Sequence, residues 1–138
     1  MINNKKVAIT YGSFDPFHYG HLNLFKRIKE FADILIVGVA TQRSHDLAGS
    51  GKVLTYPLEQ RIKWVKETGL ADLVIVEDDI NQDPYDIKTN NVDYYVMGDD
   101  YKGRKDFLNK YCKVIYLPRT QGISSSEIKQ KDLALRQV

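Results

Sequence analysis

Several features that would mark a particular class of protein are scarce in this sequence. It has a single cysteine, Cys112, so no disulfide can form within the chain, which fits a reducing compartment. Its longest apolar run, residues 34–40, is far shorter than the ~20 residues that a membrane-spanning helix needs. We therefore expect neither a disulfide-stabilised secreted domain nor a membrane protein.

An excess of one charge is also lacking. The chain has 20 Lys and Arg residues against 18 Asp and Glu, a formal net charge of +2, and its charged residues are spread along its length. This balance does not, taken alone, indicate a nucleic-acid partner. The N-terminal residues MINNKK lead into a short apolar stretch that is not typical of a signal peptide. We expect a cytoplasmic protein that binds neither nucleic acid nor membrane.

Short β-rich apolar segments alternate with helical patterns along the chain. Continuous apolar runs, typical of strands buried on both faces, occur at 6–11, 34–40, 72–77, 93–98 and 113–118. Apolar residues at helical spacing predict a helix that begins at about Gly20 and another over 58–65. Further helices are predicted at 84–91, at 104–110 and from the capping-box spacing that opens at Ser124.

This alternation predicts an α/β fold. The 138 residues suit one domain, with its core over about residues 5–130, built as a five-stranded parallel sheet flanked by helices in a Rossmann-like arrangement. Ligands of such sheets bind beyond the carboxyl ends of the strands. Polar clusters follow the expected strands at 12–21, 41–56, 98–105 and 119–126, so we expect the functional site at this edge.

The stretch GSFDPFHYGH, residues 12–21, concentrates residues that a hydrophobic core has little use for. Its glycines permit close backbone approach, and the helix that begins within it favours an anion at its N-terminus. His18 and His21 suit phosphate oxygens better than a metal ion, since no cysteine or third histidine is nearby. The alternative is one capping and one buried, hydrogen-bonded histidine. The stretch carries neither a dinucleotide-binding nor a P-loop fingerprint.

Three stretches together resemble a known family. YGSFDPFHYGH resembles the His-x-Gly-His signature of the nucleotidylyltransferases, and LPRTQGISSSEIK, residues 117–129, is similar to their second signature. VMGDDYKGRKDFL, residues 96–108, resembles the corresponding stretch of the glycerol-3-phosphate cytidylyltransferases in particular. The likeness runs over residues 5–130, in the family's order and at its separations.

The resemblance implies an enzyme that transfers the cytidylyl group of CTP to a small polyol phosphate and releases pyrophosphate. Glycerol 3-phosphate is the first candidate acceptor. The resemblance further implies Mg²⁺ as cofactor, without a metal site of the protein's own, a homodimer, and a role in supplying precursors of cell-surface polymers. Two alternatives stay open: an adenylyltransferase that uses ATP, and a nucleotide-binding sensor that has lost turnover.

Family roles carry over to the residues that match the motifs. The catalytic residues would be His18, His21, Lys52 and Arg119. The nucleotide would contact Gly12, Ser13, Phe14, Asp15, His18, His21, Gly98, Asp100, Tyr101, Arg119, Thr120, Ile123, Ser124 and Ser125. Asp15 would help to order the nucleotide or its metal ion. The acceptor would contact Lys52, Arg61 and Asp72.

The sequence departs from the family's pattern at two places. Gly69 stands where related cytidylyltransferases carry an arginine, which leaves the contacts to the acceptor or its phosphate in question. The loop over 42–56 also differs in length and composition, and Arg43 and His45 within it are expected to be solvated. The basic run KGRK, residues 102–105, is expected to be a solvated turn near the nucleotide.

Overall fold

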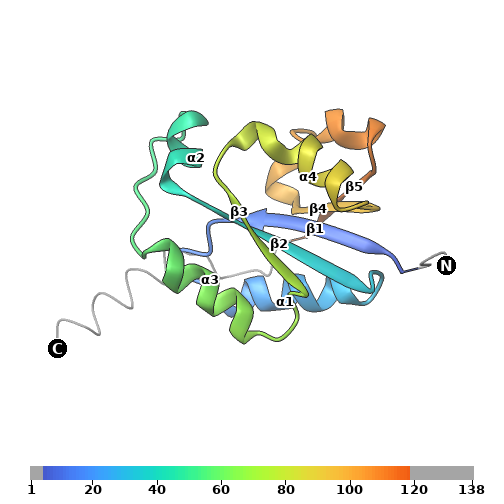
Figure 1. Cartoon of the computed structure of the whole chain (residues 1–138), viewed down its shortest axis with the longest axis horizontal. Coiled ribbons are helices and arrows are strands. Elements are labelled where there is room, and N and C mark those ends of the chain that lie inside the picture. Colours follow the sequence, from blue (N-terminus) through green and yellow to red (C-terminus); the bar gives the residue numbers. More distant parts are fainter. Residues whose placement is uncertain (1–4, 119–138) are drawn as a thin grey trace.

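The computed structural model describes residues 5–118, which form a parallel five-stranded sheet in the order β3-β2-β1-β4-β5 (Figure 1). The strands are β1 Val7–Gly12, β2 Ile34–Ala40, β3 Leu73–Glu77, β4 Tyr94–Gly98 and β5 Lys113–Leu117. Each predicted strand is confirmed to within one residue at either end. The predicted fold class is therefore confirmed.

Helices cover both faces of the sheet (Figure 1). They are α1 Tyr19–Lys29 and α3 Leu58–Glu67 on one face, and α4 Asp83–Thr89 with the 3₁₀ helix η3 Asp106–Lys110 on the other. The apolar stripe of α1, Phe25 and Ile28, packs into one core cluster, and Ile87 of α4 packs into the second. The two layers arise because each helix has only one apolar stripe to bury.

The strand order places a switch point between β1 and β4. From β1 the chain proceeds to β2 and β3 on one side, and then crosses to β4 and β5 on the other. The connections therefore leave β1 and β4 in opposite directions, which opens a crevice beyond their carboxyl ends. Gly12 and Gly98 end these two strands, so both lie at the crevice.

A short helix missed by the sequence analysis lies beyond the carboxyl end of β2. This helix, α2 Gln42–Leu47, falls in the stretch that was expected to be a loop. Thr41 caps it, because its hydroxyl oxygen accepts the backbone N–H of Ser44 at 3.1 Å. At six residues, α2 is too short for a helical period to be visible in the sequence.

Two more short 3₁₀ helices complete the carboxyl edge: η1 Ile80–Gln82 follows β3, and η2 Asp99–Tyr101 follows β4. The segment predicted as a helix at 104–110 is the 3₁₀ helix η3. The final helix predicted from Ser124 lies outside the described residues. Among residues 5–118, no helix is long and apolar enough to cross a membrane.

Candidate active site

A pocket of about 420 Å³ opens at the carboxyl edge of the sheet. This volume lies in the range of small-molecule binding sites. Strand ends, α2, the loop after it and the segments after β3 and β4 build its walls. It is lined by Tyr11, Gly12, Ser13, Ala40, Ser44, His45, Ala48, Ser50, Lys52, Glu77, Ile80, Tyr95, Met97, Tyr101, Arg104 and Lys105. Four residues of the predicted site, Gly12, Ser13, Lys52 and Tyr101, are among them.

His18 and His21 form a reciprocal cap at the N-terminus of α1. The Nδ1 atom of His18 accepts the backbone N–H of Gly20, and the Nδ1 atom of His21 accepts the backbone N–H of His18, each at 3.1 Å. The two rings stack with their centroids 3.8 Å apart. The sequence analysis offered phosphate contact and capping as alternatives, and the structure shows the capping directly.

Capping also fixes which nitrogen of each ring carries the proton. An Nδ1 atom that accepts a hydrogen bond carries no proton, so the proton of the neutral imidazole lies on Nε2. Burial, together with the neighbouring His18, lowers the pKa of His21 to about 3, so His21 is neutral at pH 7. Neither ring is part of the pocket lining, and contact of His18 and His21 with phosphate stays a prediction.

Phe14 packs against His21 from within the core. It is buried at 3% exposure, and its ring meets the His21 imidazole edge-on, with the ring centroids 4.9 Å apart. A Cβ atom on residue 12 would come within 2.9 Å of this ring, so the buried position of the Phe14 ring requires glycine at position 12. The side chain of Phe14 thus belongs to the core, and contact between Phe14 and the nucleotide stays a prediction.

Asp15 and Arg61 hold the loop that leads into α3. The carboxylate of Asp15 accepts the backbone N–H groups of Thr55 and Tyr56 at 2.8 and 2.7 Å. Arg61 donates from Nε to the carbonyl of Tyr56 at 2.9 Å, and from Nη1 to the carbonyls of Ser13 and Ala40. These contacts give Asp15 a structural task, and its predicted role with the nucleotide or its metal ion stays a prediction.

Arg61 is buried at 2% exposure and is absent from the lining of the pocket. Its guanidinium instead ties the loop after β1 to the end of β2 and to the residue before Pro57. A contact between Arg61 and the acceptor stays a prediction. Its three carbonyl contacts show that Arg61 positions the backbone segments around the pocket.

Lys52 and His45 approach the pocket from the segment after β2. Both line it, and the Nε2 atom of His45 lies 2.6 Å from the hydroxyl of Ser13. Burial lowers the pKa of His45, and the cations Lys52 and Arg61 lower it further. The expectation that His45 is solvated is wrong, because α2 turns it inward. Arg43, in contrast, is exposed and pairs with Asp78 at 3.0 Å.

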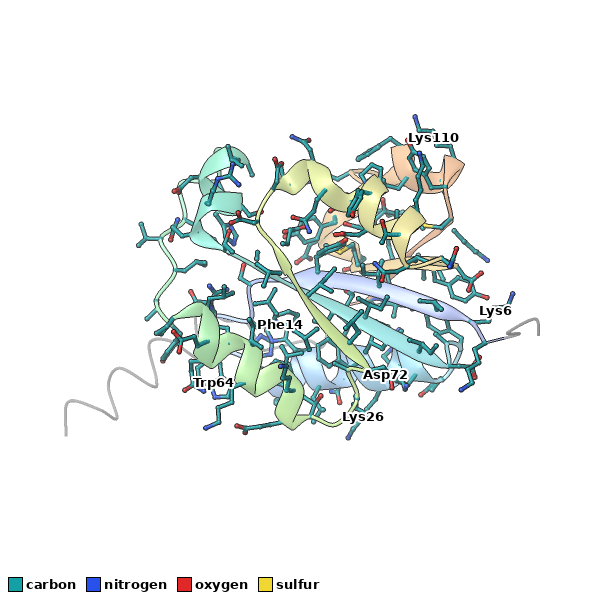
Figure 2. The ribbon with its side chains drawn as sticks, in the orientation of Figure 1. Lys6, Phe14, Lys26, Trp64, Asp72 and Lys110 are labelled. Atoms are coloured by element: carbon teal, nitrogen blue, oxygen red, sulfur yellow. The ribbon has the colours of Figure 1, made fainter. Side chains whose placement is uncertain are left out.

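Asp72 lies at the opposite edge of the sheet. It immediately precedes β3, where its carboxylate accepts from the Lys29 ammonium at 2.7 Å and from the Leu35 backbone N–H at 2.8 Å (Figure 2). The expectation that Asp72 contacts the acceptor is therefore wrong for the pocket of its own chain. Gly69 precedes the same strand and has a φ of +70° that favours glycine, which explains its presence after α3.

The segment after β4 places Asp100 and Tyr101 in η2, where both are exposed. Tyr101 lines the pocket, whereas Gly98 and Asp100 do not. The remaining predicted site residues, Arg119, Thr120, Ile123, Ser124 and Ser125, lie outside the described residues.

A buried group of acids beneath the pocket was not predicted. The hydroxyl of Tyr95 and the ammonium of Lys105 both donate to Asp83 Oδ2, at 2.7 and 3.1 Å. The hydroxyl of Tyr11 donates to Asp86 Oδ2 at 2.6 Å in the same layer. Burial, together with the charge of Asp83, raises the pKa of Glu77 to about 8.

One feature of the sequence indicates this buried group of acids. Polar residues also follow the third strand, in EDDINQD over 77–83, and the edge rule applies to them as to the other four clusters. The basic run KGRK was interpreted as a solvated turn, and this is wrong for Lys105, whose side chain is only 13% exposed. Arg104 lines the pocket as well.

Among the described residues, no group of three or more His, Cys, Asp or Glu side chains could hold a metal ion. Mg²⁺ is commonly held by substrate phosphates and water with few protein ligands. A magnesium ion that enters with a triphosphate therefore fits this site, whereas the residues over 5–118 offer no cage for a resident ion.

Comparisons with known proteins agree with this geometry. The Cytidylyltransferase-like family model matches residues 9–131. The chain is 47% identical over 130 residues to the glycerol-3-phosphate cytidylyltransferase of Bacillus spizizenii, covering 94% of this chain and 98% of the relative. It is 40% identical over 126 residues to the enzyme of the same name from Bacillus subtilis, covering 91% and 96%.

Solved structures agree on the fold. The lipopolysaccharide core biosynthesis protein from Thermoplasma volcanium superposes with a TM-score of 0.71 at 21% identity, covering 86% of this chain and all of that one. At this identity the likeness concerns the fold alone. The sequence relatives and the family model cover most of the chain, and they show that it belongs to the cytidylyltransferase-like family of nucleotidyltransferase enzymes.

Proposed function

We propose that this enzyme transfers the cytidylyl group of CTP to glycerol 3-phosphate, giving CDP-glycerol and pyrophosphate. The observation that carries the transfer reaction is the reciprocal cap that fixes His18 and His21 at the N-terminus of α1, where a helix favours an anion. The near-full-length likeness to enzymes named glycerol-3-phosphate cytidylyltransferase supports the acceptor.

The reaction needs no general base. The nucleophile is an oxygen of a phosphate monoester, whose second pKa is about 6, so it is already a dianion at neutral pH. The two histidines are poorly suited to remove a proton, because each Nδ1 atom is occupied by a backbone N–H and each Nε2 atom carries a proton. Their task is to donate hydrogen bonds to phosphate oxygens.

In the proposed step, an acceptor oxygen bonds to the α-phosphorus of CTP while the bond to the bridging oxygen breaks. The electron pair leaves with pyrophosphate. His18 and His21 stabilise the charge that develops on the transferred group, and Lys52 and Arg119 supply positive charge to the phosphates. Mg²⁺ bound to the triphosphate would neutralise part of the charge on the departing pyrophosphate.

The base is proposed to be cytosine. Asp100 follows β4 at the crevice, where its carboxylate can accept from the exocyclic amine of cytosine. Uracil lacks that amine. Tighter binding of ATP than of CTP in a calorimetric titration would contradict this assignment.

A homodimer in the cytoplasm is also proposed. The family resemblance supports the dimer, as do Leu73 and Val76, two apolar side chains exposed on the edge strand β3. The single cysteine and the use of CTP support the cytoplasm. Sedimentation equilibrium tests the dimer directly, and a mass equal to one chain at micromolar concentration would refute it.

A pyrophosphate-release screen tests the proposed function. CTP or ATP with magnesium is offered with glycerol 3-phosphate, ribitol 5-phosphate, phosphocholine and phosphoethanolamine. Turnover with CTP and glycerol 3-phosphate is the expected result. Turnover only with phosphocholine or phosphoethanolamine would refute a polyol acceptor, and turnover only with ATP would refute the nucleotide.

A further inference from the structure

Lys105 differs from the other cations that line the pocket. Lys52 and Arg104 are exposed, whereas the Lys105 side chain is only 13% exposed. Its ammonium lies 3.1 Å from Asp83 Oδ2, and Asp83 is itself 1% exposed. A long, flexible side chain is thus held with its charge at the pocket wall.

The rest of Lys105 is fixed as well. Its backbone N–H donates to the hydroxyl of Tyr116 on β5 at 3.0 Å, and that hydroxyl donates to Asp106 at 2.8 Å. Asp83 is held in turn by the hydroxyl of Tyr95 on β4. The ammonium is therefore positioned from α4, β4 and β5 before any ligand arrives, so little side-chain entropy is lost on binding.

The charges of the residues that line the pocket near Lys105 favour a bound anion. An ammonium has three N–H donors, and a single oxygen, Asp83 Oδ2, is its side-chain partner among the described contacts. Glu77 lines the pocket nearby, and burial keeps its carboxyl group protonated at neutral pH. Lys52, Arg104 and Lys105 thus face the pocket without an ionised carboxylate in its lining.

We infer that Lys105, held in place by Asp83, binds the phosphate of the acceptor. The inference rests on the proposed function and adds the residue that recognises the acceptor's charge. It also accounts for the departure at Gly69, which ends α3 at the far edge of the sheet. Lys105 supplies a cation at the pocket itself, from a segment whose basic run the sequence analysis had set aside.

Steady-state kinetics with Lys105→Gln test this inference. We expect the KM for glycerol 3-phosphate to rise at least about tenfold, while the KM for CTP changes less than about twofold, since a charge-assisted hydrogen bond to phosphate is lost. Lys105→Arg should recover part of the acceptor KM. Lys102→Gln is the matched control, because Lys102 is exposed in the same segment and absent from the pocket lining.

Removal of Lys105 alone leaves Asp83 without its cation, which can destabilise the fold. The double variant Asp83→Asn, Lys105→Gln removes both charges and keeps the kinetic test available if the single variant unfolds. An unchanged acceptor KM in either folded variant would overturn the inference. An equal rise in the KM values for CTP and acceptor would also overturn it.

Failure of the proposed function is distinguishable from failure of this inference. If the wild-type enzyme uses another polyol phosphate, the same KM comparison is made with that acceptor. If it turns over no phosphate acceptor, the proposed function fails and calorimetric titration with inorganic phosphate decides the role of Lys105. Binding that is lost in Lys105→Gln and kept in Lys102→Gln supports the role, and equal binding in both variants overturns it.

Discussion

The two halves of the carboxyl edge are built in opposite ways. Around His18 and His21 every cap contact joins residues two or three positions apart. Around Asp83 the contacts reach Tyr95 and Lys105, which lie 12 and 22 positions away. The first half is therefore a local motif placed on a scaffold, and the second exists only once the sheet has formed.

This contrast predicts different consequences of substitution. A change in the local motif should remove catalysis and leave the fold intact. A change in the long-range half should alter stability or the binding of the acceptor.

The largest effect is expected at His18. His18→Asn keeps a side chain that can cap α1 but removes the Nε2–H donor, so kcat should fall about 10²–10³-fold while stability stays near that of the wild type. His18→Ala should lose the same activity and also about 1 kcal/mol of stability. Single-turnover kinetics and urea unfolding measure the two effects. Near-normal kcat in His18→Asn would show that the histidine serves only as a cap.

Arg61 is the expected weak point of the fold beneath the site. Arg61→Met should lower the free energy of unfolding by about 3 kcal/mol, because it leaves the buried carbonyls of Tyr56, Ser13 and Ala40 without their donor. Lys63→Met is the control on the exposed face of the same helix, with an expected change within about 0.5 kcal/mol. Equal decreases in the free energy of unfolding in the two variants would show that Arg61 does not stabilise the fold through these carbonyls.

Glu77 should make stability depend on pH. Its pKa is about 8 in the folded protein against an ordinary value of 4.5, so between these values the folded state binds more protons and stability falls as pH rises. Asp83 raises this pKa from α4, whereas Lys105 and the Ser44 hydroxyl lower it. Urea unfolding across this window should show a slope that is smaller in Glu77→Gln. The same slope in both proteins would mean that Glu77 ionises normally.

The smallest effect is expected at Gly69. Gly69→Ala should cost about 1 kcal/mol, because alanine is strained at a φ of +70°, whereas Gly69→Asn should cost less. Neither should change the KM for the acceptor, since Gly69 follows α3 at the edge of the sheet away from the pocket. Thermal unfolding and steady-state kinetics check both points. A selective rise in acceptor KM would assign position 69 a part in the site.

The fold and the histidine motif could be predicted from sequence because their signals are local. Continuous apolar runs mark the five strands, and the composition of residues 12–21 is unusual enough to mark the site. The same pattern does not reveal the direction of a side chain, so the burial of Phe14 and Asp15 and their contacts within the fold could not be predicted from it.

The buried group of acids beneath the pocket could not be predicted from the sequence in the same way. Glu77, Asp83 and Lys105 come from three segments, and each is an ordinary charged residue in its own context. Only the pairing of β1 with β4 brings Tyr95, which donates to Asp83, beside Tyr11, which donates to Asp86, with ring centroids 5.5 Å apart. Helix α2, which turns His45 toward the pocket, is too short to leave a period in the sequence.

The proposed reaction is direct attack of the acceptor's phosphate on CTP, at a site that supplies hydrogen-bond donors and positive charge. The most direct test is ³¹P NMR of the products formed from CTP, magnesium and glycerol 3-phosphate labelled with ¹⁸O in its phosphate group. Direct attack predicts CDP-glycerol with ¹⁸O in the bridge between its two phosphorus atoms, and pyrophosphate without label. Label in pyrophosphate, or no CDP-glycerol from the active enzyme, would contradict it.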